Sequence, residues 1–185
     1  MTIPLTEQYR RARHNRATAY WCVVLAMYLS LALGTALQPA EWLHYGALMV
    51  HLGSVIVGLG AAVLLELWGL AWARGRSSLD DLRRIEPSVS SLAWLGIIGL
   101  LASGAFLEPN LDDPLTDLKM LAVLIVALNG VAMTRLTREL GRLPGGIAFA
   151  RIPPRLRTWC VWSALVSQAG WWTAVLVGML NTASH

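Results

Sequence analysis

The sequence contains almost no lysine, little cysteine and no motif typical of a soluble enzyme. Lys119 is the only lysine among 185 residues, whereas 14 arginines are present. The two cysteines, Cys22 and Cys160, fall near the cytoplasmic, reducing side of the predicted membrane protein, so we expect no disulfide. They form no Cys-x-x-Cys pair, so we expect no zinc site. No nucleophile triad, phosphate-binding loop or paired carboxylate site is present. These absences argue against ordinary hydrolase and kinase chemistry.

Long polar stretches are also missing, and apolar residues make up 56% of the chain. This composition is typical of a membrane protein. Five apolar runs have the length of about 20 residues that a helix needs to cross a bilayer. The predicted spans cover residues 17–37, 43–72, 88–107, 115–136 and 158–180. Because the connections are too short for a second domain, we expect an all-α protein in which residues 1–185 form a single five-helix transmembrane bundle.

The charged residues are divided between the two sides of the predicted bundle. All 14 arginines fall on one side, and the other side carries Lys119 with the carboxylates Glu41, Glu108, Asp112, Asp113 and Asp117. An excess of basic residues is typical of cytoplasmic segments, so the amino terminus is predicted in the cytoplasm and the carboxyl terminus outside. We expect the first span, with its basic leader, to be retained as a signal anchor. Arginines at span ends contact headgroups, so the net charge of +4 indicates lipid contact and no nucleic-acid binding.

The longest predicted connection joins the fourth and fifth spans on the arginine-rich side. It contains the helix breakers Pro144-Gly145-Gly146 and Pro153-Pro154. Its apolar residues Ile147, Phe149 and Ile152 stand between arginines. This pattern predicts a segment that lies on the membrane surface.

Two ionisable residues inside the predicted spans are candidate metal ligands. His51 lies about 12 Å below the outer end of the second span, too deep for a short imidazole to reach the interface. Lys119 opens the fourth span, where the charge pattern disfavours a cation; a desolvated lysine can lose its proton and bind a metal through its amine. The alternatives are a core histidine bonded to a neighbouring helix and a lysine that extends to the interface. His44, seven residues before His51, is a second choice of ligand and otherwise an interface residue.

Small residues follow both candidate ligands along their helix faces. Gly58 lies on the His51 face, and Gly130 lies on the Lys119 face. A bare helix surface admits a flat ring system, and it equally permits close packing of two helices. Trp171 and Trp172 fall in the middle of the fifth span, away from the interface where tryptophans usually lie. They are therefore candidates for packing or for contact with a cofactor.

The stretch from about His44 to Gly130 contains the short motifs His51-Leu52-Gly53, Gly58-Leu59-Gly60-Ala61, Ser103-Gly104, Lys119-Met120 and Asn129-Gly130. With these motifs it resembles an uncharacterised family of bacterial integral membrane proteins. More distantly, it is similar to the HemJ-type protoporphyrinogen oxidases and the copper-resistance D proteins. The chain differs from the HemJ-type pattern by an extra leading span and by lacking its other signature segments. The resemblance implies a multi-pass protein of the bacterial inner membrane.

In the HemJ-type enzymes, a histidine in one span and a lysine two spans further on are thought to hold haem b. The resemblance therefore implies that His51 and Lys119 ligate haem b. Under this hypothesis the bare helix faces at Gly58 and Gly130 would admit the porphyrin, and Trp171 and Trp172 would pack on its edge. The protein would then be an electron-transfer protein or a membrane oxidoreductase with a redox partner or quinone, and it could form a homo-oligomer. The alternatives are a transporter of copper or another metal ion, with His44 and His51 as successive binding stations, and a structural or assembly subunit without a cofactor.

Overall fold

The computed structural model describes the backbone of residues 5–183 and the side chains of residues 14–180, and within these ranges it contains only helices. The elements are α1 (Leu5–Ala36), α2 (Glu41–Ala73), α3 (Leu79–Gly104), α4 (Pro114–Leu140), the short 3-10 helix η1 (Phe149–Arg151) and α5 (Pro154–Ala183). Each of the five long helices contains a stretch that is long and apolar enough to cross a membrane, with mean hydropathy from 1.3 to 2.3. The prediction of five helices that are long and apolar enough to span a membrane is therefore confirmed.

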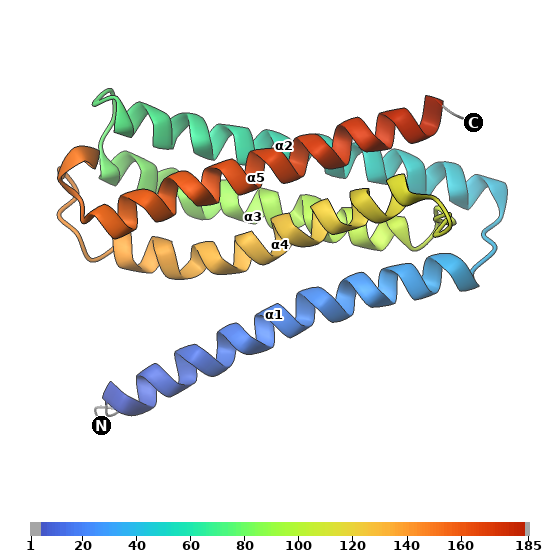
Figure 1. The fold of residues 1–185 in the computed structure, drawn as a ribbon, viewed down its shortest axis with the longest axis horizontal. Coiled ribbons are helices and arrows are strands. Elements are labelled where there is room, and N and C mark those ends of the chain that lie inside the picture. The colour runs from blue at the N-terminus through green and yellow to red at the C-terminus, as the bar shows by residue number, and fades with distance from the viewer. Residues whose placement is uncertain (1–4, 184–185) are drawn as a thin grey trace.

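The five long helices run up and down beside one another (Figure 1). Helix α2 packs mainly on α3, and α4 packs mainly on α5; α2–α5 and α3–α4 contacts join the two pairs. Helix α1 lies against α3 and α4 and diverges from them toward its amino terminus. This arrangement places the amino-terminal part of α1, the α2–α3 turn and the α4–α5 connection, which carry the arginines, at the same end of the bundle.

Local sequence explains where α3 and α4 begin. Ser78 and Asp81 form a capping box: the Ser78 hydroxyl accepts from the Asp81 amide, and the Asp81 carboxylate accepts from the Ser78 amide. Such a box satisfies two backbone donors at a helix start, so α3 begins at Leu79 and continues through Pro87. The sequence predicts a span from residue 88, so the helix extends further toward its amino terminus than the predicted span. Helix α4 begins where the sequence predicts, because Asp113 accepts from the Leu115 amide and Pro114 occupies the first turn.

Helices α2 and α3 cross at very short distance, and the crossing is made of glycine and serine. A Cβ atom built at Gly96 of α3 would lie 2.5 Å from Gly58 Cα and 2.8 Å from the Ser54 carbonyl oxygen of α2. Gly99, one turn further along α3, lies directly against the Ser54 side chain. Ser54 and Gly58 are four residues apart, as in the small-xxx-small contacts of membrane helices. On the Gly58 face of α2, the small residues therefore permit close packing of two helices, which is the alternative to contact with a flat ring system.

Apolar side chains cover both the inside and the outside of the bundle. The central cluster contains Val23, Ala62, Ile97, Leu100, Val126, Ala127, Val131 and Trp171, all less than 9% exposed. On the outside, large apolar residues such as Ile56 at 73% exposed and Tyr28 at 70% face away from the protein. A soluble protein seldom exposes so much apolar surface. Such a surface is stable when it contacts lipid.

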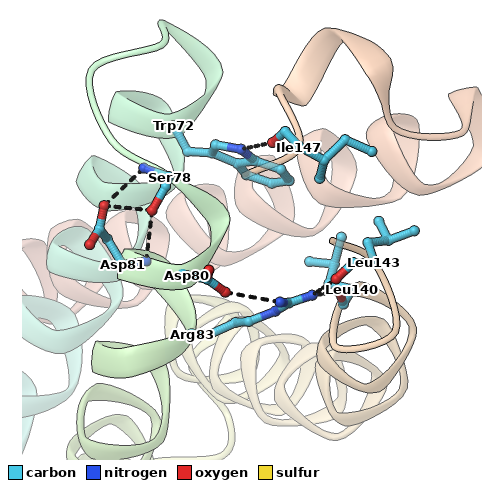
Figure 2. A network of polar contacts seen from close by, with 8 residues as sticks. All are labelled: Trp72, Ser78, Asp80, Asp81, Arg83, Leu140, Leu143 and Ile147. Carbon is cyan, nitrogen blue, oxygen red and sulfur yellow. Dashed lines mark hydrogen bonds and ion pairs between the residues drawn. The ribbon is translucent and has the colours of Figure 1, made fainter. Parts of the chain in front are cut away.

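At the arginine-rich end, the α4–α5 connection packs against the bundle (Figure 2). The Trp72 indole NH donates to the Ile147 carbonyl at 2.9 Å, and its ring meets Phe149 edge to face with centroids 5.0 Å apart. Ile152 is 2% exposed and joins Trp72, Leu79, Leu136 and Leu140 in a second cluster. The apolar residues from which a position on the membrane surface is predicted therefore pack against the end of the bundle. They turn toward the bundle because the long helices α2 and α3 leave a hydrophobic end there.

Candidate functional site

His51 is held in a fixed orientation by a residue of the neighbouring helix. Its Nδ1 atom lies 2.9 Å from the Ser103 Oγ atom of α3. The single hydroxyl proton of Ser103 is directed to the Gly99 carbonyl, 2.6 Å away, so Ser103 accepts and the His51 Nδ1–H donates. In a neutral ring this leaves the lone pair on Nε2. A histidine arranged in this way is prepared to bind a metal or a proton donor through Nε2.

His51 faces a small internal cavity where all five long helices meet. The cavity measures about 50 Å³. Its lining includes Ser30 of α1, His51 and Val55 of α2, Leu100, Leu101 and Gly104 of α3, Lys119, Met120 and Val123 of α4, and Trp171, Ala174 and Val175 of α5. Apart from the histidine, the lysine and one serine, the walls are apolar or glycine. Polar groups that converge on an apolar enclosure are typical of small-molecule and cofactor sites, although those sites usually measure about 300–1,000 Å³.

Lys119 reaches the same cavity from the opposite side of the bundle. It lies five residues into α4, and His51 lies ten residues into α2, so both belong to the half of the bundle opposite the arginine-rich end. The Lys119 stem passes α5, because a Cβ built at Gly178 would lie 3.9 Å from Lys119 Cδ. The structure therefore brings the two residues that the sequence singles out to one enclosure.

The four other residues predicted around a cofactor have different surroundings. Trp171 is 2% exposed, lines the cavity, and its ring lies directly against Gly58. The bare surface at Gly130 is covered by the Trp94 ring, 3.2 Å from where a Cβ would stand. Trp172 is 48% exposed, and its indole NH donates to Gln168 within α5. Of these four residues, only Trp171 lines the cavity with His51 and Lys119.

The residues expected for an ion path do not converge with His51. His44 does not line the cavity and is in edge contact with Tyr45. Met49 is 64% exposed on the outer surface of α2. Within the described residues, no group of three or more His, Cys, Asp or Glu side chains is placed to hold a metal ion. Both cysteines are free, as expected, with Cys22 exposed and Cys160 half-buried.

Sequence reasoning did not identify two of the groups at the cavity. Ser30 donates to the Leu101 carbonyl at 2.6 Å and so attaches α1 to α3 beside the site. Met120 contributes a thioether next to Lys119. A serine in the first span and a methionine after a lysine carry no signal by themselves. Only the packing of α1 and α4 shows that they face the same space.

Comparison of the chain with protein-family models, curated proteins and solved structures found no match. No family is therefore identified, and the HemJ-type resemblance depends on the short motifs alone. The length and hydropathy of the five helices indicate a multi-pass membrane protein, and its outer apolar surface contacts lipid.

Proposed function

We propose that the chain is a haem b-binding protein of the bacterial inner membrane, in which His51 and Lys119 would hold the iron. The observation that carries the proposal is that these two residues, from α2 and α4, line one cavity together with Trp171. The excess of arginine at the other end favours an orientation with that end in the cytoplasm. The ligands would then lie in the outer half of the membrane.

The donor set fits the iron of a haem, although the cavity is smaller than a porphyrin. An imidazole Nε2 and a neutral amine are two strong nitrogen ligands, and the Ser103 bond fixes the imidazole for this task. A volume of about 50 Å³ holds one or two water molecules at about 30 Å³ each. Binding therefore requires neighbouring helices to part. Helix α1 is the best candidate to move, because it packs less extensively than the other four helices.

The chain's own residues would set the properties of such a centre. Haem b would supply one-electron chemistry when it is bound, and two nitrogen ligands from the protein would favour electron transfer over oxygen binding. His51 and Lys119 would hold the iron, Trp171 would pack on the ring edge, and the apolar wall would exclude water. A redox partner or a quinone in the membrane would exchange the electron, which makes a membrane oxidoreductase the broader class.

Visible absorption of the detergent-purified protein, produced with ample haem and measured before and after dithionite reduction, tests this proposal. We expect a Soret band that sharpens and shifts on reduction, and that is lost or altered in His51→Ala and Lys119→Arg. Arginine is of similar length but stays protonated, so it cannot ligate the iron. His44→Ala, a histidine of the same helix outside the cavity, should leave the spectrum unchanged. A colourless wild type would refute haem binding.

Ser103 provides a second, independent prediction. Ser103→Ala removes the acceptor of the His51 Nδ1–H bond, so the ring loses its fixed orientation. Loss of such a partner typically lowers affinity about 10–100-fold. Titration of the haem-free protein with haem should show this loss, whereas Ser30→Ala, which lines the same cavity without bonding His51, should bind like wild type. Equal affinities of the two variants would mean that the Ser103 bond serves only helix packing.

The second candidate function is binding or transport of a single soft metal ion such as Cu(I). The specific observation in its favour is that Met120, a thioether ligand suited to Cu(I), lines the small cavity with His51. Metal analysis of the same purified sample distinguishes the two functions. Copper that is retained by wild type and lost in both His51→Ala and Met120→Leu would support it. A sample with neither haem nor metal would point to a structural or assembly subunit.

A further inference from the structure

A second and much larger cavity lies between α1, α3 and α4. It measures about 470 Å³, within the range of about 300–1,000 Å³ that is usual for ligand sites. Helix α1 forms one wall, and it diverges from α4 toward the arginine-rich end (Figure 1). The cavity is therefore a groove that widens toward that end. It shares no lining residue with the His51 cavity.

The groove is cationic at one end and apolar at the other. Arg16 of α1 and Arg138 of α4 line its wide end. Val23 and Val131 lie seven residues further into the bundle on the same two helices, about 10 Å along the axis, and Trp94 of α3 lines the groove beside them. The cationic end thus stands at headgroup level, and the apolar end lies at acyl-chain depth.

Among the described side chains, no carboxylate forms an ion pair with either arginine of the groove. The ion pairs of the described side chains join Arg83 to Asp80 and Arg142 to Glu139. Arg16 and Arg138 take part in none of them, and the lining of the groove contains no carboxylate. Two guanidinium groups that share a cavity mouth repel each other unless an anion lies between them. Guanidinium groups bind phosphate oxygens especially well, often through two parallel hydrogen bonds.

We propose that this groove binds one anionic phospholipid, with its phosphate between Arg16 and Arg138 and an acyl chain along Val23, Val131 and Trp94. Charge complementarity selects the anion, and the apolar depth selects a lipid over a soluble phosphate. The bound lipid fills the space between α1 and α4 and holds the divergent end of α1 to the bundle. The groove shares no lining residue with the His51 cavity, and its lipid would bind whether or not that cavity holds a cofactor.

Native mass spectrometry of the delipidated full chain, titrated with phosphatidylglycerol or phosphatidylcholine of the same acyl chains, tests the proposal. We expect one phosphatidylglycerol to bind about 30-fold more tightly than phosphatidylcholine, the factor expected for two basic side chains. The double variant Arg16→Gln/Arg138→Gln should reduce this preference to less than about threefold. The control Arg76→Gln/Arg155→Gln removes two exposed arginines at the same end outside the groove and should keep the preference.

Two further measurements separate the lipid from its headgroup and from a folding defect. Glycerol phosphate should not displace the bound lipid, and Ala19→Phe, which fills the groove, should weaken binding of both lipids. Thermal unfolding without added lipid should be similar for the two double variants. Equal binding of the two lipids by wild type, an equal preference for phosphatidylglycerol in the two double variants, or displacement of the bound lipid by glycerol phosphate would each overturn the proposal.

Discussion

Replacing Gly96 by leucine is expected to lower the free energy of unfolding by about 3 kcal/mol or more, at the upper end of the range for overpacked sites. The reason is that a Cβ at this position meets backbone atoms of α2, 2.5 Å from Gly58 Cα and 2.6 Å from its amide nitrogen. Backbone cannot rotate away as a side chain can, so α2 and α3 must separate along their whole contact. Unfolding in mixed detergent and dodecyl sulfate micelles, followed by circular dichroism, measures this loss.

The matched control is Gly60→Leu. Gly60 lies two residues from Gly58 on α2, but nothing stands within 4 Å of a Cβ built there. Its substitution should be neutral or slightly stabilising, since leucine favours a helix by about 1 kcal/mol relative to glycine. Similar losses in both variants would show that glycine acts through helix flexibility, and that the close crossing of α2 and α3 contributes little.

Gly96→Leu should also disturb the candidate site. The Gly99 carbonyl accepts a hydrogen bond from the Ser103 hydroxyl, and Gly99 lies against Ser54 at the α2–α3 crossing. The distance between His51 and Ser103 is therefore set by how closely the two helices approach. A chain with separated helices loses the fixed imidazole even if both residues are intact. Reduced haem or metal binding should thus accompany the loss of stability in Gly96→Leu.

Replacing Arg83 by glutamine is expected to cost about 3 kcal/mol, because hydrogen bonds from charged donors contribute about 1.5–3 kcal/mol and lost buried partners add to this. The Arg83 guanidinium donates to the carbonyls of Leu140 and Leu143, the latter at 2.7 Å (Figure 2). These carbonyls lie at and just beyond the end of α4, where helical partners are missing and a cation is favourable. Arg83 also pairs with Asp80 at 3.1 Å. One side chain therefore joins α3 to the α4–α5 connection.

Arg142→Gln is the control for charge at this end. Arg142 pairs with Glu139 at 3.1 Å, but its side chain is 60% exposed. Exposed ion pairs contribute at most about 1 kcal/mol, so this variant should unfold almost as wild type does. Arg83→Lys should be intermediate, since an ammonium keeps the charge but lacks the planar fork. If Arg83→Gln and Arg142→Gln unfold alike, the carbonyl contacts add nothing beyond surface charge.

The sequence by itself determined the class of the protein and the number of spans. Apolar runs of bilayer length require helices, because a strand or loop in lipid would leave backbone groups without partners. The starts of α2 and α4 are confirmed to within two residues. The sequence also singled out His51 and Lys119, because an ionisable group within a span is costly and therefore conspicuous. These conclusions need only local composition and the energy of transfer into lipid.

Tertiary structure alone decided which residues meet. Periodicity showed that Gly58 faces inward, but only packing placed Trp171 and Gly96 against it. Periodicity likewise could not show that Trp94 covers Gly130, or that Ile152 turns into the bundle. In lipid both faces of a helix are apolar, so hydrophobicity cannot tell lipid contact from helix contact. The shape of small and large side chains on neighbouring helices makes that choice, and it becomes visible only when the five helices are assembled.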